Sequence, residues 1–202
     1  MKYEGTLRSS DWNNQGICDA CYYALLQSER RQESSALKLT EVNESHRSLL
    51  WNIFQKYFYE MTNYYDNNLD SQGNYEYPYF DRYFTEPARK AFLIYDHETL
   101  VGFAMVNPYS CLQEHPDFTL AEFTIFPRYR RKRLGYLAAE QLFYSCKGTW
   151  EIKYNERNTG AKTLWNQVTK QFHPIVRRYG ESEIVLSFCT GRKEEKNVPD
   201  HV

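Results

Sequence analysis

Residues 121–140, AEFTIFPRYRRKRLGYLAAE, decide how the rest of the chain is arranged. The apolar first part predicts a strand that ends at Pro127, and the part from Leu134 onward predicts a helix. Between them, residues 128–133 hold five basic side chains in six positions. The first N–H groups of a helix lack intrahelical partners and carry the positive end of its dipole. A strand, a basic turn and a helix start therefore predict an anion site, suited to a phosphate.

Two segments resemble the motifs of one enzyme family. Residues 130–135, RRKRLG, resemble motif A of the GCN5-related N-acetyltransferase (GNAT) superfamily, Arg/Gln-x-x-Gly-x-Gly/Ala. Gly135 matches the last position, whereas Arg133 stands where the family has its first glycine. Residues 155–165, NERNTGAKTLW, resemble motif B, an Asn followed three residues later by Ala and then by Leu and an aromatic. The motifs come in the family's order and spacing, and the resemblance covers residues 37–190.

The resemblance implies an α/β fold with a mixed central β-sheet and helices on both faces. The periodicity of apolar residues fits this layout. Strands are expected at residues 37–42, 90–95, 100–106, 119–126, 149–154, 176–179 and 184–188, and helices at 45–65, 79–84, 134–146 and 159–171.

The N-terminal part is a separate feature. Residues 1–30 resemble the C-terminal hairpin of GNATs of the ribosomal-protein N-terminal acetyltransferase type, and strands are expected at 3–8 and 17–26 around a polar loop at 9–16. A lone hairpin is marginally stable in water, so we expect it to dock on a sheet edge; a remnant without a role is an equal alternative. The expected parts are 1–36, hairpin and linker; 37–190, acetyltransferase domain; and 191–202, charged tail. The residues that match the hairpin are Glu4, Gly5, Arg8, Gly16, Asp19, Tyr23, Leu25 and Leu26.

The resemblance also implies acetyl-CoA as the cosubstrate, between the strand before motif A and the strand before motif B. The peptide groups of Phe123 and Ile125 would pair with its pantetheine arm, and Asn158 would bind it or cap the following helix. A solvated basic turn or a nucleic-acid patch is the alternative, but the preceding strand and Gly135 favour CoA, and no nucleic-acid partner is expected. The residues expected to bind the pyrophosphate are Arg130, Arg131, Lys132, Arg133, Leu134 and Gly135.

Two residues are expected to carry the chemistry. An attacking amine must lose a proton, and Glu122 is a lone carboxylate in an apolar strand, in a region where the family often places its base; the alternative is an ion-paired glutamate. The leaving thiolate benefits from a proton donor, for which the family often uses a Tyr at the position of Trp165. An indole N–H is not acidic, so Tyr154 or Tyr136 would substitute, unless each only forms part of the pocket wall.

The acceptor is expected to be a small-molecule or peptide amine. Residues 63–81 carry many tyrosines and carboxylates, which together suit a small cationic amine; a polar surface loop is an equal alternative. The leading function is an N-acetyltransferase that transfers the acetyl group directly. Arg133 and Trp165 support the alternative, a non-catalytic acyl-CoA-binding or protein-interaction module.

Composition excludes several other classes. A net charge of −1 makes the basic turn a local feature of a balanced chain. Five cysteines show no regular spacing, and the CxxC of Cys18 and Cys21 has no second pair, so no metal site is expected. No apolar run is long enough to span a membrane, and the N-terminus has no signal-peptide core. These features predict a cytoplasmic protein without membrane contact, and the unpaired edges of the hairpin favour a homodimer.

Overall fold

The computed structural model describes residues 2–13, 16–24 and 37–191, which belong to two compact units, Met1–Ala36 and Leu37–Val202. In the first unit, β1 (Lys2–Asn13) pairs antiparallel with β2 (Gly16–Ala24), so the expected hairpin is present. Residues 9–13 continue β1, where we expected a polar loop. Register shifts within β1 accommodate its extra residues. Leu25, Leu26, the linker and residues 192–202 of the expected tail lie outside the described residues, and docking of the hairpin stays a prediction.

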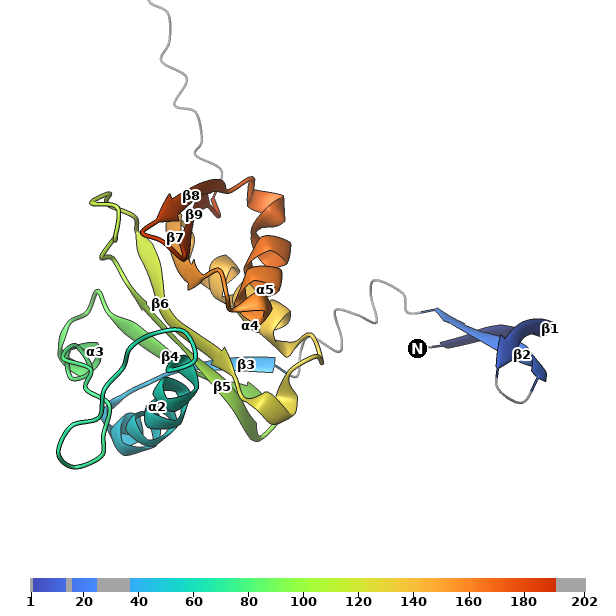
Figure 1. Cartoon of the computed structure of the whole chain (residues 1–202), viewed down its shortest axis with the longest axis horizontal. Coiled ribbons are helices and arrows are strands. Elements are labelled where there is room, and N and C mark those ends of the chain that lie inside the picture. Colours follow the sequence, from blue (N-terminus) through green and yellow to red (C-terminus); the bar gives the residue numbers. More distant parts are fainter. Residues whose placement is uncertain (1, 14–15, 25–36, 192–202) are drawn as a thin grey trace, which may run out of the picture. The chain divides into compact units, whose positions relative to one another are not determined.

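The second unit contains a seven-stranded mixed sheet (Figure 1). Only β6 and β7 pair in parallel, and each of the other neighbouring pairs is antiparallel. This sheet confirms the expected fold class, and most observed bounds lie within two residues of the expected ones. In spatial order the strands are β3 (Leu37–Glu41), β4 (Lys90–Asp96), β5 (Thr99–Asn107), β6 (Phe118–Ile125), β7 (Thr149–Asn155), β9 (Glu183–Cys189) and β8 (Ile175–Tyr179).

Helices cover both faces of this sheet, as expected (Figure 1). The long helix α2 packs on one face, and α4 and α5 pack on the other. The expected helix at 45–65 ends early, because residues 62–65 turn away from α2. The helical segments are η1 (Glu44–His46), α2 (Arg47–Met61), α3 (Arg82–Thr85), η2 (Pro127–Tyr129), α4 (Leu134–Ser145), α5 (Thr159–Thr169) and η3 (Lys170–Phe172).

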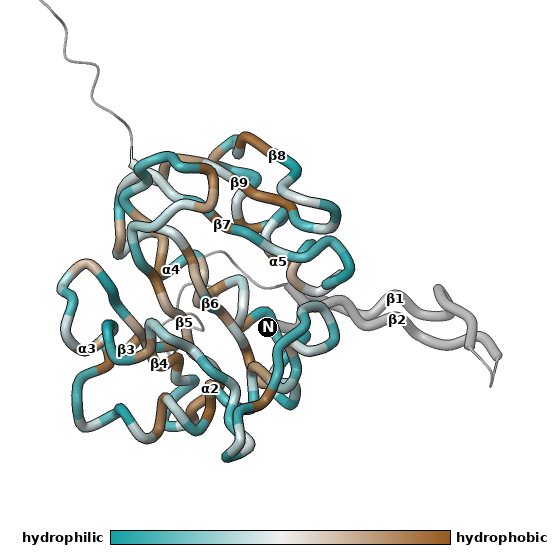
Figure 2. Tube along the Cα trace, turned by 60° about the vertical axis from the view of Figure 1, so that its left-hand side comes forward, coloured by the Kyte–Doolittle hydropathy of each residue, from teal (hydrophilic) through white to brown (hydrophobic). Residues whose placement is uncertain are grey.

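Two apolar layers hold these helices to the sheet. Neighbouring residues of a strand point to opposite faces, so Phe92 of β4 packs in the layer under α4 and α5, whereas Leu93 packs in the layer under α2. Phe143 of α4 is fully buried in the first layer, and Phe54 of α2 is fully buried in the second. Figure 2 shows hydrophobic stretches along the central strands and hydrophilic residues over most connecting loops. The sheet is thus fixed from both sides.

Strand β6 departs from regular pairing near its middle. Val106 of β5 pairs with Leu120 and Met105 pairs with Glu122, so Ala121 is an extra residue that forms a β-bulge. The pairing of β6 with β7 ends at Leu120 and Ile152, although both strands continue. Beyond this point β6 and β7 diverge, and the peptide groups of β6 on that side have no partner in β7.

Candidate active site

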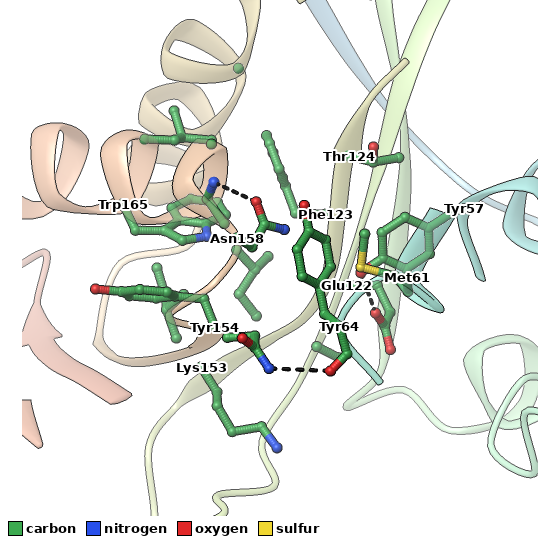
Figure 3. A pocket seen from close by; sticks show the side chains of 18 of the residues that line it. Tyr57, Met61, Tyr64, Glu122, Phe123, Thr124, Lys153, Tyr154, Asn158 and Trp165 are labelled. Atoms are coloured by element: carbon green, nitrogen blue, oxygen red, sulfur yellow. Dashed lines mark hydrogen bonds between the residues drawn. The ribbon is translucent and has the colours of Figure 1, made fainter. Parts of the chain in front are cut away.

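A cavity of about 1630 Å³ lies where β6 and β7 diverge. Residues 119–125 of β6 and 151–155 of β7 form two of its walls. The start of α5, the last turns of α2 and the loop after α2 also line it. Figure 3 shows Glu122, Phe123 and Tyr154 entering from the strands, with Tyr64 entering from the loop after α2. The cavity therefore collects residues from segments that are far apart in the sequence.

The basic turn presents one edge of this cavity. Arg131, Arg133 and Gly135 line it, and α4 begins directly after Arg133, which is its N-cap residue. A Cβ atom added to Gly135 would meet Ile125 and Leu164 at an ordinary 3.5 Å. Packing alone does not require glycine here, so the missing side chain leaves room on the cavity side. The unpaired N–H groups of the first turn of α4 and the two arginines suit an anion.

The other basic-turn residues take different positions. The Arg130 side chain donates to the Ile125 carbonyl oxygen at 2.7 Å and to Glu60 of α2 at 2.6 Å. Its charge thereby ties the end of β6 to α2, although Arg130 also lines the cavity. Lys132 is exposed, with its Nζ atom 5.8 Å from the Tyr129 ring. Leu134 is buried in the core. Neither Lys132 nor Leu134 lines the cavity. Lys132 would therefore act on a bound anion through its positive charge at a distance, and Leu134 only through its backbone N–H group.

Arg133 adopts the backbone conformation that usually requires glycine, with φ of 62° and ψ of 1°. This left-handed conformation costs a non-glycine residue about 1 kcal/mol. We therefore expect Arg133→Gly to raise the free energy of unfolding by about 0.5–1 kcal/mol and Tm by about 2–4 °C, measured by thermal unfolding. Lys132→Gly is the matched control, because its φ is not positive; it should lower Tm. An equal loss of stability in both variants would contradict this interpretation.

The residues expected to contact the pantetheine arm and the second motif lie together. The Phe123 ring packs edge-on against Trp165 with centroids 5.0 Å apart. Trp165 is 5% exposed, so at the position of the family's usual Tyr it serves as a packing residue. Asn158 caps α5, because its Oδ1 atom accepts the N–H of Ala161 at 3.0 Å. The capping alternative for Asn158 is therefore present, and Asn158 also lines the cavity.

Glu122 lies on the cavity wall with its side chain partly open to the cavity. Its Oε2 atom accepts the hydroxyl hydrogen of Tyr57 at 2.8 Å (Figure 3). Burial raises the pKa of Glu122 to about 7, and this rise is opposed by hydrogen bonding to Tyr57 and Tyr77 and by the charge of Lys153. A carboxyl group with this pKa can accept a proton near neutral pH, which is the property that a general base needs.

The raised pKa of Glu122 also predicts how stability depends on pH. The folded state holds this proton up to about pH 7, whereas an unfolded chain releases it near 4.5. The folded state binds more protons between these values, so stability falls as pH rises through them. Relative to wild type, Glu122→Gln should gain about 2 kcal/mol in free energy of unfolding between about pH 5 and about pH 8. Denaturant unfolding at both pH values measures this gain, and an equal difference at both would contradict it.

Two tyrosines differ in how they face the cavity. Tyr154 is 5% exposed, burial raises its pKa, and its hydroxyl interacts with Asn166 of α5. In Figure 3 its ring lies below Trp165 with the hydroxyl directed away from Glu122. Tyr64 instead extends into the space between β6 and β7. Its carbonyl oxygen accepts hydrogen bonds from the side chains of Asn155 and Arg157, at 3.3 and 2.8 Å, which fix this loop over the end of β7.

Sequence reasoning did not distinguish Tyr64 from its neighbours. It was one of many tyrosines in residues 63–81, and the bonds that position it come from residues about 90 positions later in the chain. Tyr136, the other expected donor, is half-buried on the cavity edge with its ring 5.7 Å from the guanidinium carbon of Arg133.

The expected acceptor region is only partly on the cavity. Its tyrosines Tyr64, Tyr65, Tyr77 and Tyr79 line the wall, but its carboxylates are elsewhere. Asp70 accepts the N–H groups of Gln72 and Asn74, each at 2.8 Å, and so closes its own loop. Asp81 pairs with Arg47, and neither Asp66 nor Glu76 lines this cavity. The acidic residues of 63–81 therefore do not supply the charge of the cavity.

Metal-binding groups and membrane-spanning helices are both absent from the part of the chain that the structure describes. Residues 37–191 contain no group of three or more His, Cys, Asp or Glu side chains placed to hold a metal ion. In the same residues, no helix is long and apolar enough to cross a membrane.

Comparisons with known proteins identify the class and then the family. The fold is shared with solved acetyltransferases. The model of the acetyltransferase (GNAT) family matches residues 47–168, more than half of the chain, so the chain belongs to this family. It is an acetyltransferase, and acetyl-CoA is its cosubstrate. A search of the curated proteins finds no match.

Solved structures share the fold at low sequence identity. An acetyltransferase from Thermus thermophilus is 18% identical, with a TM-score of 0.56, over 76% of this chain and 97% of that one. A putative acetyltransferase from Salmonella typhimurium, yncA, solved with acetyl-CoA, is 11% identical, with a TM-score of 0.54, over 83% and 99%. The ribosomal-protein-S18-alanine N-acetyltransferase from Escherichia coli is 14% identical, with a TM-score of 0.52, over 79% and 97%.

Proposed function

We propose that the protein transfers the acetyl group of acetyl-CoA directly to a small-molecule or peptide amine. The observation that carries this proposal is Glu122, a carboxyl group with a pKa of about 7 on the wall of the cavity between β6 and β7. The amine nitrogen forms a bond to the thioester carbonyl carbon, and the carbon–sulfur bond breaks. The proton of the amine passes to Glu122, directly or through water, and the sulfur of CoA takes up a proton.

The chain offers separate groups to the two ends of acetyl-CoA. Beyond Leu120 the peptide groups of β6 have no partner in β7, so we infer that the peptide groups of Phe123 and the N–H of Ile125 pair with the pantetheine arm, the Ile125 carbonyl oxygen being bonded to Arg130. The N–H groups of residues 131–135 would then bind the pyrophosphate, with Arg131 and Arg133 supplying charge. Arg130 would act mainly by holding the turn, since its side chain already bonds to Glu60 and Ile125. Lys132 would add charge from outside the cavity, Leu134 a backbone N–H, and Asn158 its amide.

Two tyrosines, Tyr154 and Tyr64, are candidates to donate a proton to the leaving sulfur of CoA. Tyr154 is the donor expected from the sequence, and the interaction of its hydroxyl with Asn166 leaves it beside α5. Tyr64 places its side chain in the space between the diverging strands (Figure 3). We therefore infer that Tyr64 takes this role and that Tyr154 shapes the pocket wall.

The cysteines and the edge of the sheet bear on the cellular compartment and the oligomeric state. Three cysteines of the second unit, Cys111, Cys146 and Cys189, are free thiols, which suits the reducing cytoplasm. Strand β8 lies at the sheet edge, and its Ile175 and Val176 side chains are 58% and 60% exposed. An exposed apolar edge strand is a site where a second copy can pair, so we infer a cytoplasmic homodimer.

The test is release of free thiol from acetyl-CoA over a panel of amines, with the product identified by mass spectrometry. Acetylation of an amine supports the proposal. The alternative is a non-catalytic acyl-CoA-binding or protein-interaction module. In the sequence, the departures from the family motifs at Arg133 and Trp165 support it. Binding of CoA by calorimetry without turnover on any amine would support the alternative, and absence of CoA binding would remove both.

A further inference from the structure

A pair of arginines lies on the wall of the same cavity, apart from the basic turn. Arg82 of α3 and Arg89, just before β4, are both lining residues. Arg89 is 7% exposed, and its guanidinium carbon lies 4.5 Å from the ring centroid of Tyr109, 5.1 Å from that of Tyr79 and 5.5 Å from that of Tyr83. Three aromatic rings thus hold a buried cation in place against the cavity.

The positive charge of this pair is only partly balanced. Glu86 pairs with Arg89 at 2.7 Å and with Arg82 at 3.0 Å. Within residues 37–191, Glu86 is the only carboxylate that forms an ion pair with either arginine. Glu86 is not itself a lining residue. Two guanidinium groups therefore share one carboxylate, and about one positive charge remains on the cavity wall.

Two other charged residues, Lys153 and Glu151, also line the cavity. Lys153 is paired with Glu183 at 3.2 Å. Glu151 is 1% exposed and accepts hydrogen bonds from the Ser110 hydroxyl and the Cys111 N–H. The ion pair with Glu183 balances Lys153, and Glu151 is held by two neutral donors, so Arg82 and Arg89 remain two guanidinium groups on the cavity wall that share one carboxylate.

The arginine pair lies close to the proposed base. Glu122 interacts with Tyr77, Tyr77 with Tyr83, and Tyr83 with Arg89. Only the side chains of Tyr77 and Tyr83 therefore separate the carboxylate of Glu122 from the guanidinium of Arg89 in this series of contacts. A small molecule can therefore present its amine to one and a second polar group to the other.

We propose that the acceptor amine carries a carboxylate, which Arg82 and Arg89 bind while the amine faces Glu122. This proposal rests on the proposed acetyl transfer and names the substrate class. The planar guanidinium group suits a carboxylate because it can donate two parallel hydrogen bonds. The cationic acceptor that the sequence favoured relied on the carboxylates of residues 63–81, which do not line this cavity. Amino acids, or a peptide that begins with an acidic residue, have the required chemistry.

The experiment compares acceptors that differ only in the carboxylate. Tyrosine and lysine are each tested against their primary amides and against tyramine and cadaverine, with the full-length protein and acetyl-CoA. A peptide with an N-terminal aspartate and an amidated C-terminus supplies the carboxylate from a side chain instead. Of tyrosine and lysine, we consider the one that is acetylated faster. We expect its kcat/KM to exceed that of its own amide by on the order of 10- to 100-fold. Amides carry more unprotonated amine at neutral pH, so amine basicity cannot produce this preference.

Substitutions of the two arginines test whether they cause the preference for a carboxylate-bearing acceptor over its amide. Arg82→Gln should reduce the acid-to-amide ratio of kcat/KM about 10-fold, and Arg89→Gln should reduce it further. The Arg82 side chain is 53% exposed, so its variant should fold even if Arg89→Gln does not. Arg178→Gln is the matched control, because that side chain is 56% exposed, forms one ion pair and does not line the cavity; it should leave the ratio unchanged.

The outcomes separate this inference from the proposed function. Turnover without preference for the acid, or a ratio that Arg82→Gln leaves unchanged, would overturn the inference while acetyl transfer stands. If no amine is acetylated, calorimetry with CoA present compares the binding affinities of the acid and of its amide instead. Tighter binding of the acid, weakened by Arg82→Gln, then supports the inference although acetyl transfer fails. Equal binding of acid and amide overturns it.

Discussion

Replacing Glu122 with glutamine is expected to lower kcat/KM for amine acetylation by about 100- to 10,000-fold, the range that positioned general bases contribute. Glutamine keeps the shape of the side chain but cannot take a proton from the amine. In wild type the rate should rise with pH through about 7, because Glu122 is active only after it has lost its own proton. Initial rates of thiol release over this pH range measure both effects, and the variant should lose the inflection.

Tyr57→Phe provides the control for this assignment. It removes the hydrogen bond that Glu122 accepts at 2.8 Å, and that bond holds the pKa of Glu122 down. The inflection in the wild-type profile should therefore move to higher pH without disappearing. Both variants should bind CoA as wild type does, measured by calorimetry. A Glu122→Gln enzyme within threefold of wild type, with the same pH profile, would mean that another group or bulk water accepts the proton.

The fold and the cosubstrate could be predicted because their signals are local. The strand–turn–helix order of residues 121–140 is written in consecutive residues, and an apolar period of two or of 3.6 depends only on neighbours in the sequence. Arg133 could be identified as a departure from the family motif for the same reason. Its left-handed backbone conformation shows that the turn keeps a glycine-like geometry despite the side chain.

The side-chain partners within the site could not be predicted, because they join distant segments. The sequence predicts that Arg130 is a phosphate ligand. In the structure its side chain bonds to Glu60, which lies 70 residues earlier in the chain. Tyr64 is fixed by Asn155, 91 residues later. The positions of the carboxylates in residues 63–81 could not be predicted either, since Asp70 bonds to loop N–H groups and Asp81 pairs with Arg47. Charge in a sequence segment does not reveal which face of a loop it occupies.

Replacing Tyr64 with phenylalanine is expected to lower kcat by about 100-fold, at the lower end of what a positioned proton donor contributes. The carbonyl oxygen of Tyr64, not its hydroxyl, makes the bonds to Asn155 and Arg157, so the variant should keep the loop in place and bind CoA normally. The loss concerns protonation of the departing sulfur. It should therefore shrink with an acetyl thioester of a more acidic thiol, and rates with both thioesters measure it.

Tyr154→Phe is the matched control, because it removes one hydroxyl from another tyrosine that lines the same cavity. The Tyr154 hydroxyl interacts with Asn166 of α5, so its loss should change kcat by less than about threefold while lowering stability by about 1 kcal/mol. A large loss of kcat in Tyr154→Phe with little change in Tyr64→Phe would restore the donor that the sequence favoured. If both variants turn over like wild type, the sulfur of CoA leaves as a thiolate and takes its proton from water, because neither tyrosine would then be acting as an acid.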